Sequence, residues 1–204
     1  MLHVEHFIET LLPGLNAEVV VSKFKTLEEQ YFKWNKVYNL SSIRDKDGFW
    51  EKHVLDSMCL ASYIYKEDGD GAALYDIGSG GGFPGLVLAI TLKNTITMVE
   101  PVGKKTGFIE HMITRLQLKN AKILKTRYEE IKEIEGGSII VSRALGNYKE
   151  LKKHFSKIAP NSKILLMATQ AQTKEIGGKI IETPYLQARS ENPKLLPGHV
   201  LLQI

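Results

Sequence analysis

The sequence predicts an α/β fold: a doubly wound, mostly parallel sheet with an antiparallel edge, preceded by a short helical N-terminal extension. From residue 74 onward, short apolar runs alternate with longer segments of helical periodicity. Before that point, residues 16–36 and 47–65 repeat apolar side chains at helical spacing. The chain has 204 residues, enough for one domain and few for two. We therefore expect residues 1–70 to pack as a helical extension on a core of residues 71–204, as one compact unit.

The strands of the core are predicted from short apolar runs that are typical of buried parallel strands. These runs are Leu74–Ile77, Thr95–Val99, Lys122–Leu124, Ile139–Val141 and Ile164–Met167. Helical patterns begin near Gly85, near Lys104 and after Asn147. Two further runs, Lys179–Thr183 and His199–Ile204, have no helical pattern between them, so we expect them to form a hairpin at the edge of the sheet.

Composition excludes several classes of protein. Hydrophobic residues make up 43% of the chain and charged residues 25%, as in ordinary soluble domains. We find no secretory signal and no apolar stretch of about 18 residues, so we expect a cytoplasmic protein without a membrane segment. The single cysteine, Cys59, excludes an internal disulfide, a zinc site of several thiolates and a thiolate-held iron–sulfur centre. No other cluster has metal-ligand spacing, and we predict no metal.

Positive charge is concentrated in one part of the chain. The formal net charge is +4, and residues 101–132 carry eight Lys or Arg against three Glu. Such a run indicates either a solvated helix face or a surface for an acidic partner such as a nucleic acid. Under the second interpretation, Lys104 and Lys105 are the first candidates for phosphate contacts.

Residues 74–85, which follow a strand and open a helix, match two ligand-binding patterns. Gly80, Gly82 and Gly85 fit the G-x-G-x-x-G pattern of dinucleotide-binding proteins, and Glu100 follows Gly80 by 20 residues, as that pattern requires. The same turn fits the D-x-G-x-G-x-G loop of proteins that bind S-adenosylmethionine, through Asp76, Gly78, Gly80 and Gly82. A glycine-rich turn without any ligand is the third interpretation.

Charge favours S-adenosylmethionine over a nicotinamide dinucleotide. A pyrophosphate at the helix N-terminus would lie close to the carboxylate of Asp76, which is unfavourable. S-adenosylmethionine has no phosphate, and its ammonium and sulfonium are both stabilised by a carboxylate. Glu100 suits either cofactor, because both present ribose hydroxyls to a carboxylate at the end of the second strand.

The flanking segments resemble a known family. WNKVYNLSSI at residues 34–43 and KHVLDS at residues 52–57 resemble the front of the bacterial glucose-inhibited division protein B family, the small-subunit (16S) rRNA guanine-N7 methyltransferases. Residues 76–85 resemble its cofactor loop, in which Phe83-Pro84-Gly85 is more specific than the glycines. Further matches are Glu100-Pro101, Lys104-Lys105, Phe108, RYEE at residues 127–130 and Ser142-Arg143-Ala144. The resemblance covers about residues 30–145. It departs from the family at residues 167–170, MATQ, where a Lys-Gly is usual.

The resemblance implies a class I, Rossmann-like S-adenosylmethionine-dependent methyltransferase with a three-layer sheet. It implies methyl transfer to N7 of a guanine in 16S ribosomal RNA, with the RNA or the small ribosomal subunit, or an assembly intermediate of it, as partner. The cofactor contacts that it implies are Gly78, Phe83, Tyr128, Glu129 and Arg143. Two alternatives stay open: a non-catalytic rRNA-binding module with a nucleoside site, and an NAD-dependent oxidoreductase.

The residues are compatible with N7 as the target. The fourth strand ends in Ser142-Arg143-Ala144-Leu145, unlike the Asn/Asp-Pro-Pro-aromatic run common in methyltransferases of exocyclic amines. The N7 lone pair is available at neutral pH, so catalysis needs positioning and electrostatic support but no general base. We expect Arg143 and His53 to position the reactants. We expect His53 and Asp56, three apart on one helix face, to border the substrate; the alternative is a pair that fixes the helix against the sheet.

Overall fold

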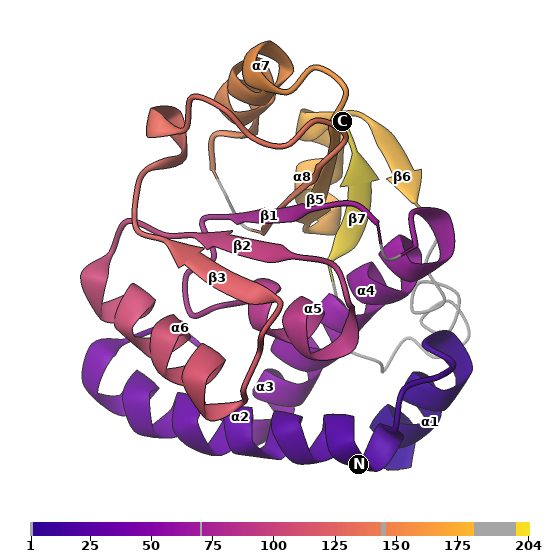
Figure 1. The fold of residues 1–204 in the computed structure, drawn as a ribbon, viewed down its shortest axis with the longest axis vertical. Helices are drawn as coiled ribbons and strands as arrows, with labels where there is room; N and C mark the ends of the chain where they lie inside the picture. Colours follow the sequence, from indigo (N-terminus) through magenta and orange to yellow (C-terminus); the bar gives the residue numbers. More distant parts are fainter. Residues whose placement is uncertain (1, 70, 144–145, 182–198) are drawn as a thin grey trace.

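The structure is a computed structural model that describes residues 2–69, 71–143, 146–181 and 199–204. Seven strands form one sheet in the order β3-β2-β1-β4-β5-β7-β6 (Figure 1). They are β1 (Leu74–Ile77), β2 (Ile96–Val99), β3 (Ala121–Leu124), β4 (Ile139–Arg143), β5 (Lys163–Ala168), β6 (Lys179–Ile181) and β7 (Val200–Gln203). The first five strands run parallel, whereas β7 is antiparallel to both β5 and β6. The predicted α/β fold with an antiparallel edge is therefore confirmed. Residues 182 and 183 of the predicted edge strand lie outside the described residues.

Helices cover both faces of the sheet, because alternate residues of each strand point to opposite faces (Figure 1). One face carries a core to which the helices α1, α2, α4, α5 and α6 contribute. The other face packs on α7, with the segment around Ile131 and Ile134. The helices are α1 (Leu2–Leu11), α2 (Ala17–Tyr38), α3 (Lys46–Phe49), α4 (Asp56–Glu67), α5 (Gly85–Thr91), α6 (Gly103–Arg115), α7 (Tyr148–Ile158) and α8 (Gln170–Ile176). A π-helix, Trp50–Leu55, joins α3 to α4, and a 3₁₀ turn, Tyr128–Glu130, follows β3.

The helical extension packs closely on the core. Helix α2 buries Phe24, Leu27 and Tyr31 completely, and Trp34 lies 5.7 Å from Phe108 of α6, measured between ring centroids. None of the described helices is long and apolar enough to cross a membrane. The boundary predicted between residues 70 and 71 stays a prediction, and residue 70 lies outside the described residues.

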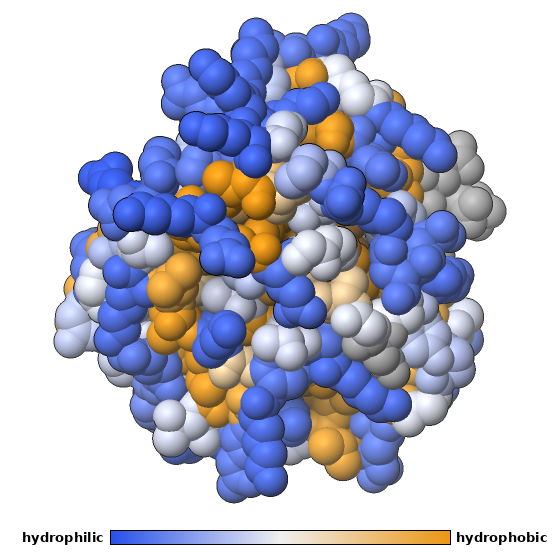
Figure 2. All heavy atoms as spheres, turned by 45° about the horizontal axis from the view of Figure 1, so that its top comes forward, coloured by the Kyte–Doolittle hydropathy of each residue, from blue (hydrophilic) through white to orange (hydrophobic). Residues whose placement is uncertain are grey.

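Figure 2 shows the face that comes forward when the top of Figure 1 is turned toward the viewer. This face is mainly hydrophilic, with apolar side chains interspersed. Helix α7 lies at the top in Figure 1 and exposes Lys149, Lys152, Lys153 and Lys157 on its outer side. Its buried side consists of Leu151 and Phe155.

Candidate functional site

The predicted cofactor residues meet at one edge of the sheet. Because β1 to β5 run parallel, their carboxyl ends lie together, and open α/β sheets bind ligands in the crevice outside those ends. Gly78 follows β1, Glu100 follows β2, Tyr128 and Glu129 follow β3, and Arg143 ends β4. We call this the carboxyl edge.

A hollow of about 260 Å³ opens over β1, β2 and β3 at the carboxyl edge. It is lined by Gly78, Val99, Glu100, Pro101, Thr126, Arg127, Tyr128 and Glu129. Four residues predicted from the sequence thus line one cavity. Its volume lies slightly below the range of about 300–1,000 Å³ that is usual for pockets holding a whole drug-sized ligand. The hollow therefore suits the nucleoside part of a cofactor.

Glu100 is held rigidly in the wall of the hollow. Its side chain is 4% exposed; Oε2 accepts a hydrogen bond from the Gly80 N–H at 2.8 Å, and Oε1 accepts one from the Val102 N–H at 3.0 Å. An ionised carboxylate has further lone pairs, so both oxygens can still accept hydrogen bonds from ribose hydroxyls. Glu100 thus has a structural role that the sequence pattern did not predict, in addition to its predicted contact with the cofactor.

Asp76 lies beneath the glycine-rich loop. It is fully buried, and its Oδ2 accepts a hydrogen bond from the Gly85 N–H at the start of α5 at 2.9 Å. Burial raises the pKa of Asp76 to about 6, although the Gly85 N–H opposes this. Oδ1 has no hydrogen-bond partner among the described residues. A partly compensated negative charge at this place suits a cationic ligand such as S-adenosylmethionine and disfavours a pyrophosphate.

Two glycines of the loop are required by close packing. A Cβ atom on Gly85 would lie 2.4 Å from Cγ of Met98 and 2.7 Å from Oδ2 of Asp76. A Cβ atom on Gly82 would lie 2.4 Å from Cδ1 of Leu86, and Gly82 has φ +85°. A side chain at Gly85 would push α5 away from the sheet, and one at Gly82 would displace Leu86 and require a backbone conformation that favours glycine, so part of the glycine pattern serves packing.

Arg143 and His53 form a second group at the carboxyl edge, beside the hollow. The Arg143 guanidinium donates to the Lys52 carbonyl oxygen at 2.7 Å and to Nδ1 of His53 at 2.9 Å. The His53 ring stacks on Phe83, with centroids 4.1 Å apart and planes inclined by 4°. Phe83 is 2% exposed, with Arg143 over its ring at 5.8 Å. Phe83 therefore supports this group, and its predicted contact with the cofactor stays a prediction.

His53 is neutral in this environment. Burial, followed by the nearby charge of Arg143, lowers the pKa of His53 to about 2. Because Arg143 can only donate, Nδ1 must accept, and the proton of the neutral ring lies on Nε2, 3.2 Å from the Ser41 hydroxyl. The Nδ1 lone pair of His53 is thus occupied by Arg143 and is not available to remove a proton from a substrate.

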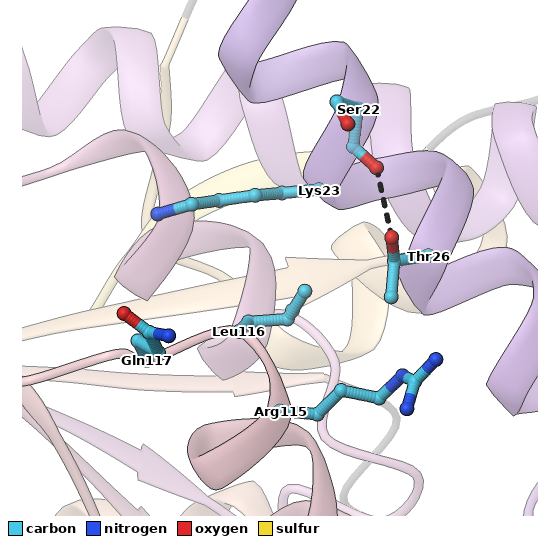
Figure 3. A pocket seen from close by; sticks show the side chains of 6 residues that line it. All are labelled: Ser22, Lys23, Thr26, Arg115, Leu116 and Gln117. Atoms are coloured by element: carbon cyan, nitrogen blue, oxygen red, sulfur yellow. Dashed lines mark hydrogen bonds between the residues drawn. The ribbon is translucent and has the colours of Figure 1, made fainter.

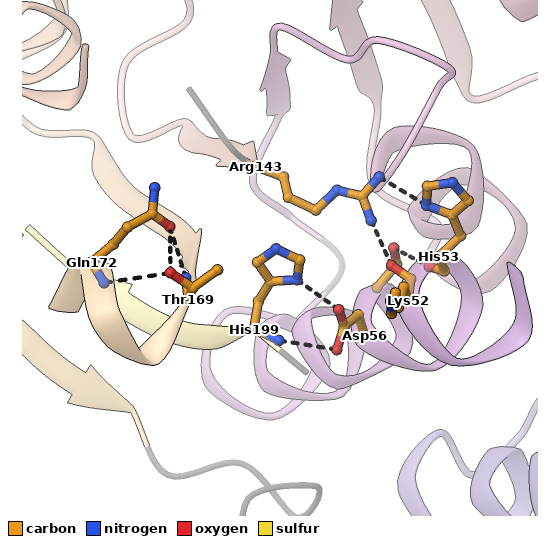
Figure 4. A network of polar contacts seen from close by, with 8 residues as sticks. Lys52, His53, Asp56, Arg143, Thr169, Gln172 and His199 are labelled. Atoms are coloured by element: carbon orange, nitrogen blue, oxygen red, sulfur yellow. Dashed lines mark hydrogen bonds and ion pairs between the residues drawn. The ribbon is translucent and has the colours of Figure 1, made fainter. Parts of the chain in front are cut away.

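Asp56, predicted together with His53, has a different partner. Its Oδ2 lies 2.6 Å from Nδ1 of His199, and its Oδ1 accepts a hydrogen bond from the His199 backbone N–H at 3.2 Å (Figure 4). No hydrogen bond joins Asp56 to His53 among the described residues. Sequence analysis placed His199 at the start of a predicted edge strand but did not single it out as a site residue, because it is a lone histidine and its partner, Asp56, lies 143 residues earlier in the chain.

The predicted phosphate contacts lie at the start of α6, near the same edge. Lys104 is exposed and Lys105 is half-buried. Their contact with RNA stays a prediction. In the part of the chain that the structure describes, no group of three or more His, Cys, Asp or Glu side chains is arranged to hold a metal.

A larger hollow, of about 520 Å³, lies away from these residues (Figure 3). Ser22, Lys23 and Thr26 of α2 line it, together with Arg115, Leu116 and Gln117 at the end of α6. Helix α6 ends near the amino end of β3, so this hollow is at the opposite edge of the sheet from Glu100. We assign the site by its chemical groups, and none of the predicted cofactor residues lines this larger hollow.

Comparisons with known proteins agree with this assignment. The chain matches the family model described as rRNA small subunit methyltransferase G over residues 20–196. It is 38% identical over 146 residues to "Ribosomal RNA small subunit methyltransferase G" of Francisella tularensis subsp. tularensis, covering 69% of this chain and 67% of the relative. It is 34% identical over 165 residues to the protein of the same name from Cellvibrio japonicus, covering 78% and 75%.

Solved structures agree with the fold. A SAM-dependent methyltransferase from Aquifex aeolicus superposes with a TM-score of 0.54 at 15% identity, covering 84% of this chain and 97% of that one. A putative S-adenosyl-L-methionine-dependent methyltransferase from Methanococcus maripaludis superposes with a TM-score of 0.53 at 14% identity, covering 88% and 92%. The architecture is thus that of class I methyltransferases.

Proposed function

Because the chain belongs to the rRNA small subunit methyltransferase G family, we propose that it transfers the methyl group of S-adenosylmethionine to N7 of a guanine in 16S ribosomal RNA. The observation that carries this proposal is the family match over residues 20–196. That range includes the hollow over β1 to β3 and the group around Arg143. It therefore covers both the predicted cofactor residues and the residues beside them.

The charges of the site support S-adenosylmethionine as methyl donor. Asp76 and Glu100 place two carboxylates around the glycine-rich loop, and the hollow beside Gly78 has room for a nucleoside. S-adenosylmethionine supplies an electrophilic methyl group on a cationic sulfur. Its transfer to N7 moves the positive charge to the base without release of a proton, so no side chain has to act as general base. The engaged Nδ1 of His53 agrees with this requirement.

Ribosomal RNA as substrate also accounts for the basic character of the chain. Eight Lys or Arg lie between residues 101 and 132, and Lys104 and Lys105 begin α6 near the carboxyl edge. Phosphate contacts from such residues supply affinity that does not depend on sequence. The activity would take place in the cytoplasm, where small ribosomal subunits are assembled, on the RNA, an assembly intermediate or the finished subunit.

Methyl transfer can be tested with the purified chain, S-adenosylmethionine labelled in the methyl group, and small subunits from a strain that lacks the gene. After digestion to nucleosides, we expect the label in 7-methylguanosine. Label in another nucleoside would contradict N7 as the target.

Calorimetric titration separates the two alternatives. Binding of NAD without binding of S-adenosylmethionine would indicate an oxidoreductase. Binding of S-adenosylmethionine and of rRNA without any transfer would indicate a non-catalytic module.

A further inference from the structure

The Asp56–His199 pair lies at the carboxyl edge, on the other side of β1 from the cofactor hollow. Strand β7 is antiparallel to β5, and the register pairs Val200 with Ala168. His199, one residue before β7, therefore lies next to Thr169, at the end where the parallel strands terminate. Figure 4 shows His199 and Arg143 on the same side of the helix that carries Asp56. The cofactor hollow lies over β1, β2 and β3. The carboxyl ends of β4 and β5 and the amino end of β7 are therefore the part of this edge where a second reactant can bind.

The contacts of the pair determine which nitrogen of His199 can accept a hydrogen bond. Asp56 is 3% exposed, and its ionised carboxylate can only accept, so Nδ1 of His199 must carry a proton toward it. In the neutral ring, Nε2 then has the free lone pair. Figure 4 shows this second nitrogen pointing away from Asp56. Within the part of the chain that the structure describes, Nε2 has no hydrogen-bond partner, and the side chain is 21% exposed.

We propose that His199, oriented by Asp56, contacts the nucleobase that receives the methyl group, with Nε2 accepting a hydrogen bond from an N–H of that base. The inference rests on the proposed function and adds a residue to its substrate site. Guanine carries such donors at N1 and at its 2-amino group, away from N7. Arg143 complements the His199 acceptor, because a guanidinium offers only hydrogen-bond donors. Several of its N–H groups remain available beyond the two bonds that it makes.

The acceptor also suits the course of the reaction. The bond between sulfur and the methyl carbon breaks, the bond between N7 and that carbon forms, and the positive charge passes from sulfur to the base. As the base becomes cationic, its N–H groups become stronger donors, and no proton has to leave. A hydrogen bond to Nε2 therefore strengthens between the ground state and the transition state, which is the kind of interaction that raises the rate of the chemical step.

A purely structural role must be distinguished, because Asp56 also holds the backbone N–H of His199 and so ties β7 to α4. The substitutions His199→Asn and His199→Gln separate the two roles. The Asn amide can take the place of Nδ1 and keep the bond to Asp56, but it leaves nothing at the position of Nε2. The Gln amide reaches the position of Nε2 and offers an acceptor there. His6→Asn on α1, where the side chain is exposed, is the matched control.

The measurement is the single-turnover rate at saturating S-adenosylmethionine and small subunits, together with the melting temperature of each variant. We expect His199→Asn to melt close to the wild type and to transfer methyl about tenfold more slowly or worse, which corresponds to the loss of one transition-state hydrogen bond. We expect His199→Gln to recover part of the rate, and His6→Asn to match the wild type.

A second variant tests the orientation of the ring. In Asp56→Asn, the amide can donate to Nδ1, which moves the proton to Nε2 and turns the acceptor into a donor. We expect a rate loss similar to that of His199→Asn, and a change of His199 tautomer in nitrogen-15 NMR spectra. Asp56→Asn at the wild-type rate, with the tautomer changed, would overturn the inference.

The outcomes for the inference and for the proposed function differ. His199→Asn at the wild-type rate would overturn the inference alone, and so would His199→Gln as slow as His199→Asn with both variants folded. A wild-type chain that binds S-adenosylmethionine but transfers no methyl group to small subunits would overturn the proposed function, and the inference with it.

Discussion

Acid should destabilise the fold through His53 in particular. Burial and Arg143 lower its pKa to about 2 in the folded protein, against 6.5 as the ordinary value. Between these values the unfolded chain binds a proton that the folded chain does not bind, so stability falls as the pH drops below 6.5. The stabilising contribution of neutral His53 is thus present above pH 6.5 and is lost toward acid. A pH of ~5 lies about 1.5 units below the ordinary pKa of histidine, so the free energy of unfolding falls there by about 2 kcal/mol, at about 1.36 kcal/mol per unit.

The assay is urea unfolding at pH ~7.5 and pH ~5 for the wild type and for His53→Gln, which cannot be protonated. Between the two pH values, the free energy of unfolding should fall by about 2 kcal/mol more in the wild type than in His53→Gln. The variant's own loss of stability at neutral pH cancels, because only the pH dependence is compared. His6→Gln on α1, where the side chain is exposed, should behave as the wild type. An equal pH dependence in wild type and His53→Gln would refute the reasoning, since it would mean that His53 takes up its proton inside the fold.

Three further predictions concern the cofactor, the RNA and the reaction rate. Glu100→Ala should weaken binding of S-adenosylmethionine about tenfold or more in titration calorimetry. It should also lower the melting temperature of the free protein, because two backbone N–H groups lose their acceptor. Unchanged affinity would disprove the ribose contact. Replacing Lys104 and Lys105 by Glu should weaken RNA binding in filter assays and leave the affinity for S-adenosylmethionine unchanged. The affinity of the wild type for RNA should fall steeply with salt concentration. A flat salt dependence would count against phosphate contacts. His53→Gln should slow single-turnover methyl transfer on the order of tenfold, less than the 10²–10⁴ typical of a lost acid or base. Arg143→Ala should be slower still, since it removes two hydrogen bonds. A drop beyond about a thousandfold for His53→Gln, with RNA binding intact, would mean that a proton is removed.

The strands and the cofactor hollow could be predicted because local patterns specify them. Apolar runs with glycine-rich breaks marked β1 to β5 within one or two residues of each end. Once the strands are parallel, their carboxyl ends must lie together, which explains why Gly78, Glu100 and Tyr128 line one hollow. The glycine-rich pattern singled out Gly78 and Glu100, whereas Tyr128 was implied by the family resemblance. Helix α8 was not predicted, because its seven residues include few apolar side chains; the capping box of Thr169 and Gln172 at its start is the one local signal that could have indicated it.

The substrate side could not be predicted to the same depth, because tertiary contacts determine it. A regular helix would place His53 and Asp56 on one face, but the π-helix Trp50–Leu55 intervenes and their partners differ. His53 turns to Arg143, and Asp56 turns to His199, at the far end of the chain. Nothing in the local sequence indicates which strand a lone histidine will adjoin.

The most direct test of the central claim is the nucleoside content of small-subunit rRNA from a strain that lacks the gene, measured by mass spectrometry. We predict that 7-methylguanosine is lost from one position, returns when the wild-type gene is supplied, and does not return fully with Arg143→Ala. An unchanged level of 7-methylguanosine in the deletion strain, or the loss of a different modified nucleoside, would contradict the assignment.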